Sequence, residues 1–233
     1  MCRGLSAALT TPPSNKNPRV SYRRAASPRF CTLENSYNPS VTTPRGQTRH
    51  RRRYDGIGHA RLLTFSCFQR RPFLRAVRTR DWFLHALASA KQRHAVHVWA
   101  CVVMPEHVHL LVFPTDRDVR IGAFLASLKT PIARKAAAWV RAHAPSAAEA
   151  MTQTHPGGQS VFRFWQRGGG YDQNLWSEKH IWHAIDYIHL NPVRRGLCGS
   201  LYEWPMSTAR AHRGDADAVL EFDRQYLPGR PSS

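Results

Sequence analysis

The sequence lacks several features that would assign it to a particular class of protein. It has no run of about 18 apolar residues, so no membrane span is expected, and its first residues form no convincing signal peptide. No internal repeat is visible. The cysteines are scattered and include no C-x-x-C pair: Cys2, Cys31, Cys67, Cys101 and Cys198. This set argues against a disulfide framework or a zinc finger and for a reducing, cytoplasmic environment.

Acidic residues are also scarce. The chain of 233 residues carries 15 Asp and Glu against 34 Lys and Arg, a net charge of +19, and most of the positive residues are Arg. Because the guanidinium group pairs well with phosphate, this balance favours a polyanionic partner, most simply a nucleic acid. The alternative is a basic surface or tail without a specific partner.

Residues 1–55 differ in composition from the rest. They are rich in Pro, Ser, Thr, Asn and Arg, carry 11 Lys and Arg against 2 Asp and Glu, and show no hydrophobic period. We expect a disordered basic extension, because such a composition buries too little apolar surface to offset the entropy of ordering. One interpretation is a basic arm that contacts the phosphates of a nucleic acid. The other is an upstream extension of little functional consequence, which could even result from a wrongly assigned start codon. A domain over 56–212 and a C-terminal tail over 213–233 follow.

The hydrophobic pattern of the remainder predicts an α+β fold. Helices are expected at 79–94, with Asp81 in the first turn, at 119–144, where Pro131 introduces a kink or a break, and at 177–191, ending at Pro192. Strands are expected at 60–68, 97–104, 107–113 and in the first half of 160–172. This order predicts a ferredoxin-like antiparallel sheet with helices on one face, followed by a further C-terminal helix.

Two histidines, His107 and His109, lie inside the apolar stretch VVMPEHVHLLVFP. Side chains two apart on a strand point to the same face, with Cα atoms about 6–7 Å apart. Two imidazoles so placed can bind one divalent ion. The pattern is weak by itself, since a buried histidine is more often part of a core.

Tyr187 and Asn191 lie four residues apart in the last predicted helix and therefore share one of its faces. A tyrosine can act as a covalent nucleophile, and an amide oxygen suits a hard ion such as Mg²⁺ or Mn²⁺. The competing interpretation is a tyrosine packed in the core and an asparagine that caps the helix before Pro192.

The motifs together resemble one known family. MPEHVHLLV resembles the signature of the single-strand His-hydrophobic-His (HUH) transposases, and YIHLNPVRRGL resembles their tyrosine helix. WQRGGGYD at 165–172 and EWPMSTAR at 203–210 narrow the resemblance to the REP-associated tyrosine transposases, which are often encoded in bacterial genomes beside palindromic repeats. The resemblance runs from about residue 58 to 212 and leaves residues 1–55 outside.

The resemblance implies a role for each matching residue. His107, His109 and Asn191 match the ligands of a divalent metal ion, Mg²⁺ or Mn²⁺, and Tyr187 matches the nucleophile that forms a 5′-phosphotyrosine. Glu106 stands where the family often has Asn, a departure expected to leave the ligands unaffected. The implied protein is a nucleoid-associated cytoplasmic transposase, monomeric or homodimeric, that cleaves and rejoins single-stranded hairpin or palindromic DNA.

Other residues are candidates for contacts with DNA. Trp165 and Tyr171 are expected either to stack on bases or to pack in the core, and Trp204 and Ser207 are assigned a DNA contact. His183 shares the face of Tyr187 and either orients it, contributes to the metal shell or lies on the helix surface. The basic residues expected to follow the DNA backbone, each of which is alternatively a solvated surface charge, are Arg70, Arg71, Lys129, Arg134, Lys135, Arg163, Arg167, Arg194 and Arg195.

Two other functions stay open at this point. One is a domesticated protein that recognises palindromic repeats without cleaving DNA. The presence of every candidate catalytic residue argues against it. The other is a structural metal protein unconnected to DNA, in which removal of the metal would unfold the domain.

Overall fold

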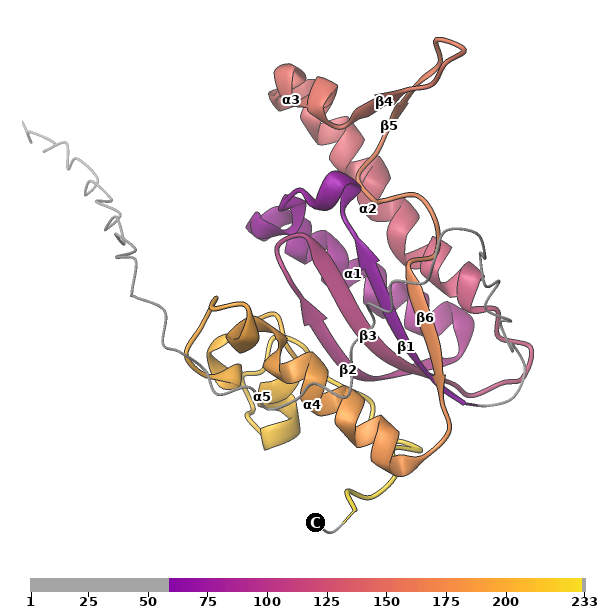
Figure 1. Ribbon diagram of the computed structural model, residues 1–233, viewed down its shortest axis with the longest axis vertical. Helices are drawn as coiled ribbons and strands as arrows, with labels where there is room; N and C mark the ends of the chain where they lie inside the picture. Colours follow the sequence, from indigo (N-terminus) through magenta and orange to yellow (C-terminus); the bar gives the residue numbers. More distant parts are fainter. Residues whose placement is uncertain (1–58, 232–233) are drawn as a thin grey trace, which may run out of the picture. The chain divides into compact units, whose positions relative to one another are not determined.

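The computed structural model describes residues 59–231, so the predictions for residues 1–55 lie outside the described part (Figure 1). Its main sheet has the strand order β2-β3-β1-β6 with antiparallel neighbours. This order confirms the predicted ferredoxin-like arrangement. The strands are β1 (Ala60–Ser66), β2 (Val96–Val103), β3 (His107–Pro114) and β6 (Tyr171–Leu175), and the helices between them are α1 (Val77–His94) and α2 (Ile121–His143).

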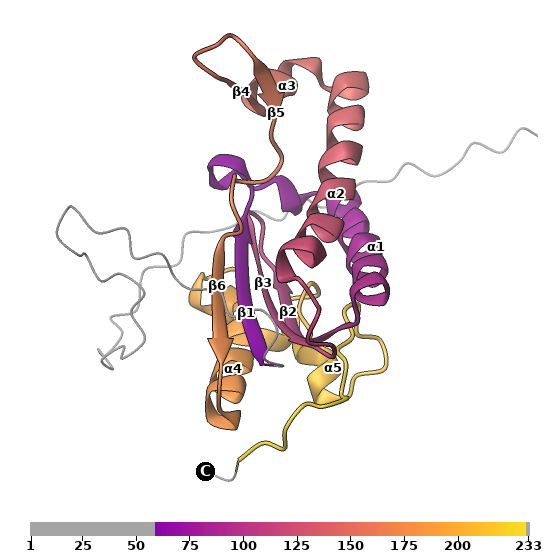
Figure 2. The ribbon, with the colours of Figure 1, turned by 90° about the vertical axis from the view of Figure 1, so that its right-hand side faces the viewer.

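Helices cover both faces of this sheet. Figure 2 shows α1 and α2 on one side and α4 (Glu178–Arg194) on the other. Because side chains alternate along a strand, Leu63 and Val108 enter the core beneath α1 and α2, whereas Leu62 and Leu111 enter the core beneath α4. The first core confirms the helices on one face, and the second belongs to the additional C-terminal helix.

The predicted position of the fourth strand is wrong. Residues Ser160–Phe162 (β5) pair instead with Thr152–Thr154 (β4) in a separate two-stranded sheet, which follows α3 (Pro145–Ala150). The fourth strand of the main sheet is β6, with the sequence YDQNL. The hydrophobic pattern does not reveal it, because an edge strand needs few apolar side chains and only Leu175 is buried here.

The predicted helix boundaries also need correction. α1 begins at Val77, which leaves Asp81 outside its first turn. α2 continues through Pro131, where the neighbouring Ile132 is fully buried, so packing outweighs the lost hydrogen bond. α4 continues through Pro192 to Arg194. Its predicted start is confirmed, since Ser177 accepts a hydrogen bond from the His180 amide.

The chain after α4 packs against the sheet and the helix. It contains a short 3₁₀ turn (Leu201–Glu203) and α5 (Ala209–Arg213). Farther on, Asp223 accepts a hydrogen bond of 2.6 Å from the Val98 amide, and Trp182 donates one of 2.9 Å to the Gly229 carbonyl. The predicted tail is thus held on the domain. No helix within residues 59–231 is both long and apolar enough to span a membrane.

Replacing Gly170 with alanine is expected to destabilise the domain. Gly170 has a φ of 75°, and a Cβ there would meet the Thr64 carbonyl oxygen at 1.9 Å, so β6 could not stay paired with β1. We expect Gly170→Ala to lower the free energy of unfolding by at least about 2 kcal/mol in urea titrations. Gly168→Ala is the matched control, because Gly168 also has a positive φ but open space around it. Equal losses in the two variants would contradict the steric explanation.

Candidate functional site

The turn between β2 and β3 is fixed by backbone hydrogen bonds. The Leu74 amide donates to the Pro105 carbonyl at 2.9 Å, and the Cys67 amide donates to the Glu106 carbonyl at 2.8 Å. β3 therefore starts at a defined point, His107, with its register on β1 set. In that register His109 lies opposite Thr64.

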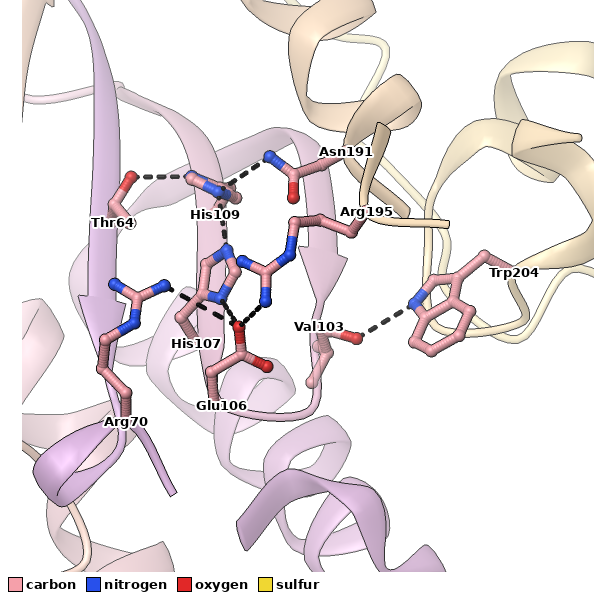
Figure 3. Close-up of polar contacts among 9 residues, drawn as sticks. All are labelled: Thr64, Arg70, Val103, Glu106, His107, His109, Asn191, Arg195 and Trp204. Carbon is pink, nitrogen blue, oxygen red and sulfur yellow. Dashed lines mark hydrogen bonds and ion pairs between the residues drawn. The ribbon is translucent and has the colours of Figure 1, made fainter. Parts of the chain in front are cut away.

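The two imidazole rings face each other through their Nε2 atoms, which are 3.0 Å apart (Figure 3). Each Nδ1 atom has an oxygen partner on the opposite edge of its ring. The Thr64 hydroxyl lies 2.7 Å from His109 Nδ1, and the Glu106 carboxylate lies 3.1 Å from His107 Nδ1. These partners hold the rings so that both Nε2 atoms point to one place.

α4 brings the remaining predicted residues to the same place. Its buried stripe ends at Asn191, whose amide group lies 3.2 Å from His109 Nε2. Turning that amide over puts its carbonyl oxygen at this position in place of the nitrogen. Tyr187, one turn earlier and half-buried, has its ring 5.4 Å from the ring of His109. The structure thus brings together the four residues that the sequence singled out.

Burial favours the uncharged form of both histidines, because it lowers the pKa of each. It lowers the pKa of His109 to about 3, and the neighbouring His107 adds to this effect. Burial also lowers the pKa of His107, although Glu106 acts in the opposite direction. Neutral imidazoles carry the free electron pair that a metal ligand needs.

The donor set fits a divalent cation. Two ligand atoms about 2.1 Å from an ion and at right angles to each other are separated by about 3.0 Å, and the two Nε2 atoms are 3.0 Å apart. Within residues 59–231 no three His, Cys, Asp or Glu side chains are placed to hold a metal ion. His107, His109 and the amide oxygen of Asn191 could hold one, with other positions left for substrate or water.

Three of the predicted basic residues border this site. Arg194 lies over the Tyr187 ring at 5.5 Å. Arg195 and Arg70 both reach the Glu106 carboxylate, at 2.9 Å and 3.7 Å. They place positive charge at the border of the site, beside Tyr187 and beside the Glu106 carboxylate.

A groove of about 670 Å³ lies between α2 and residues 162–169, and apolar side chains such as Leu125 and Phe164 form its walls. Four other predicted basic residues line this groove: Lys129, Arg134, Arg163 and Arg167. Arg163 donates to the Gln153 side chain, and Lys129 donates to the Gly168 carbonyl. The groove meets the end of β1 that carries Ser66, the partner of His107 in the sheet. Arg71 and Lys135 are exposed outside its lining.

Several other candidates are explained by packing. Trp165 is buried and donates to the Lys129 carbonyl, and Tyr171 donates to Gln173. The assigned DNA contact of Ser207 is wrong, since its side chain is 1% exposed, and Trp204 is half-buried and donates to the Val103 carbonyl. His183 is exposed on α4.

Sequence reasoning missed two residues of the site. Glu106 was expected to leave the ligands unaffected, but its carboxylate contacts His107 directly. Thr64 received no role because its partnership with His109 depends on the β1–β3 register, which the sequence does not display. The available signal was a threonine between the apolar residues Leu63 and Phe65 of β1.

Comparisons with known proteins agree with the motifs. The chain is 25% identical over 142 residues to the REP-associated tyrosine transposase of Escherichia coli (strain K12), covering 60% of this chain and 68% of the relative. A solved structure of a REP-associated tyrosine transposase bound to a REP hairpin matches with a TM-score of 0.55 and 22% identity, covering 78% of this chain and 98% of that one. No protein-family model matches. The resemblance drawn from the motifs and the predicted fold are both confirmed.

Replacing Thr64 with valine is expected to weaken the domain by removing one hydrogen bond. The shape is kept, but Nδ1 of the buried His109 loses its partner, which costs about 1–3 kcal/mol in the free energy of unfolding. Urea titrations measure this loss. Thr115→Val is the matched control, because the Thr115 hydroxyl makes an exposed hydrogen bond to the Ala95 carbonyl. A Thr64→Val domain as stable as the control would refute the role given to this hydroxyl.

Proposed function

We propose that the chain is a REP-associated tyrosine transposase, which cleaves and rejoins single-stranded DNA at hairpins or palindromes through a 5′-phosphotyrosine and requires Mg²⁺ or Mn²⁺. The observation that carries the proposal is the convergence of Tyr187 and Asn191 with His107 and His109, although Asn191 and His109 are 82 residues apart in sequence. Neither the histidine pair nor the helix spacing alone would support it.

The proposed reaction exchanges one phosphodiester for another. The Tyr187 oxygen, after loss of its proton, attacks the scissile phosphorus in line with the bond to the 3′ oxygen. That bond breaks, the leaving 3′ oxygen takes up a proton from water, and the 5′ phosphate stays on Tyr187. A bound divalent ion supplies charge neutralisation at the phosphate oxygens. Because a phosphodiester is conserved, rejoining to a 3′ hydroxyl needs no nucleotide cofactor.

Arg194, Arg195 and Arg70 support this chemistry from the rim of the site. Guanidinium groups form charge-assisted hydrogen bonds with phosphate oxygens and hold them in fixed directions. The guanidinium carbon of Arg194 lies over the Tyr187 ring, 5.5 Å from its centre, so a phosphate bound to Arg194 would lie beside the residue that carries the nucleophile. We assign these three residues to phosphates next to the cleaved bond.

The groove lined by Lys129, Arg134, Arg163 and Arg167 suits a second segment of the same DNA. The related protein of known structure is bound to a REP hairpin. We propose that the present chain also takes a hairpin and that its phosphates follow this groove. Apolar walls beside the cations offer surfaces for sugars and bases.

Replacing Tyr187 with phenylalanine is expected to abolish formation of a covalent adduct, since the nucleophilic oxygen is removed. The substrate is a hairpin oligonucleotide with a single-stranded flank, incubated with Mn²⁺ and carrying a label at its 3′ or its 5′ end. With the unaltered protein, the 3′ label should move with the protein on a denaturing gel, and the 5′ label should appear in a shorter free strand.

Tyr202→Phe is the control, because Tyr202 is an exposed tyrosine of the same region. An equal yield of adduct from Tyr187→Phe would refute the nucleophile, and a 5′ label on the protein would refute the polarity. Hairpin binding by the unaltered protein without cleavage in either metal would instead support the non-catalytic, repeat-binding alternative.

The double variant Arg134→Ala/Arg167→Ala is expected to bind the hairpin about 10-fold or more weakly at moderate salt. Each lost phosphate contact should also reduce the slope of log affinity against log salt concentration by about 0.7–0.9. Titrations followed by fluorescence anisotropy measure both quantities. Arg93→Ala/Arg117→Ala is matched in charge and exposure but lies outside the groove. Equal weakening in the two double variants would show only an effect of net charge.

A further inference from the structure

Glu106 is a carboxylate of the site that the proposed reaction does not use. It is largely buried in the turn before β3, with 9% of its surface exposed, and its backbone carbonyl is bound to the Cys67 amide. Carboxylates are rarely buried unless they are paired, because the charge loses its hydration. The contacts that compensate this one therefore indicate what it does.

One oxygen of Glu106, Oε1, makes the contacts that define its position (Figure 3). It lies 3.1 Å from His107 Nδ1, 2.9 Å from Nη2 of Arg195 and 3.7 Å from Nη2 of Arg70. The side chains of the two arginines are 49% and 63% exposed, so both are reachable from solvent while the carboxylate is not. The negative charge thus lies behind His107, covered by two cations.

Glu106 is placed to act on His107 and not on the ion itself. Nδ1 and Nε2 lie on opposite edges of an imidazole ring, and Glu106 contacts the edge that faces away from His109. A carboxylate at Nδ1 keeps the proton on that nitrogen, so the electron pair stays on Nε2. It also makes the ring a stronger ligand, because accepting the hydrogen bond from Nδ1 increases the electron density on Nε2.

The same carboxylate connects His107 to the tyrosine helix. Tyr187 and Asn191 lie one turn apart on α4, and Arg195, four residues after Asn191, is the residue that caps the end of the helix. Tyr187 and Asn191 contact His109, and Arg195 contacts Glu106. Glu106 therefore fixes His107 relative to the helix that carries the nucleophile.

We propose that Glu106 is a positioning residue, which sets the tautomer and direction of His107 and thereby raises the affinity of the site for a divalent ion before DNA is bound. This inference rests on the metal site of the proposed function. It concerns a position where the resembled family often has Asn, so the resemblance does not imply a role for the carboxylate.

The first test measures Mn²⁺ binding to the full chain without DNA, from the electron paramagnetic resonance signal of free Mn²⁺. We expect Glu106→Gln to weaken binding about 10- to 100-fold, the range found when a group that supports a metal ligand is removed. Glu203→Gln is the control, since Glu203 is an exposed carboxylate that accepts a hydrogen bond from the Gly199 amide.

Cleavage rates separate positioning from a general structural defect. If Glu106 acts through His107, the Glu106→Gln variant needs more Mn²⁺ for half-maximal cleavage, but its rate at saturating Mn²⁺ returns to within about threefold of the unaltered protein. Hairpin binding without metal should be unchanged. Unchanged Mn²⁺ affinity in a folded Glu106→Gln variant would overturn the inference.

A second measurement needs no variant. Long-range ¹H–¹⁵N spectra report which nitrogen of a neutral histidine carries the proton, and we expect Nδ1 for His107 in the metal-free protein. A proton on Nε2 would overturn the inference even if Glu106→Gln fails to fold. Loss of Mn²⁺ binding in His107→Ala/His109→Ala tests the metal site separately. If the unaltered protein binds no Mn²⁺, the proposed metal site and this inference both fail.

Discussion

The packing of α4 against one face of β3 is the interaction on which the site depends. Residues alternate between the faces of a strand, so Val108 and Leu110 enter the core beneath α1 and α2 while His107 and His109 point toward α4. The apolar stripe of α4, including Ile185 and Ile188, is buried on that same face. The helix thus carries its polar C-terminal turn directly to the histidines.

This arrangement buries polar side chains inside an apolar interface. The hydrogen bonds among these side chains offset the free-energy cost of removing them from water. Thr64 contacts Nδ1 of His109, and Glu106 contacts Nδ1 of His107. Asn191 lies beside Nε2 of His109. Within the described part of the chain no buried side-chain nitrogen or oxygen lacks a partner. The rings are therefore held in place by the protein itself, so the metal binding proposed above would need little reorganisation of the site.

Local patterns made much of the fold and the central residues predictable. The histidine pair and the tyrosine–asparagine spacing each lie within one element, so their shared faces follow from strand and helix geometry. The roles of Thr64 and Glu106 were not predicted. The role of Thr64 arises from the register of β1 on β3, and the role of Glu106 arises from a turn that is held by residues distant in sequence. The fourth strand was misplaced because its sequence at the sheet edge, YDQNL, has almost no hydrophobic pattern. The nearby segment VFRFW has a strong hydrophobic pattern and was predicted as the strand instead.

The separate sheet of β4 and β5 has a consequence for how such a protein can diverge. The residues from Pro145 to Phe162 lie outside the four-stranded sheet, although Met151 is buried in the core beneath α1 and α2. The chain returns to that core at Phe164 and Trp165, before β6 begins. Insertions or deletions in this excursion reshape one end of the basic groove and leave the pairing of β1 with β3 and β6 intact. If the groove takes DNA as proposed, its shape can therefore change while the strand pairing that positions His107 and His109 stays the same.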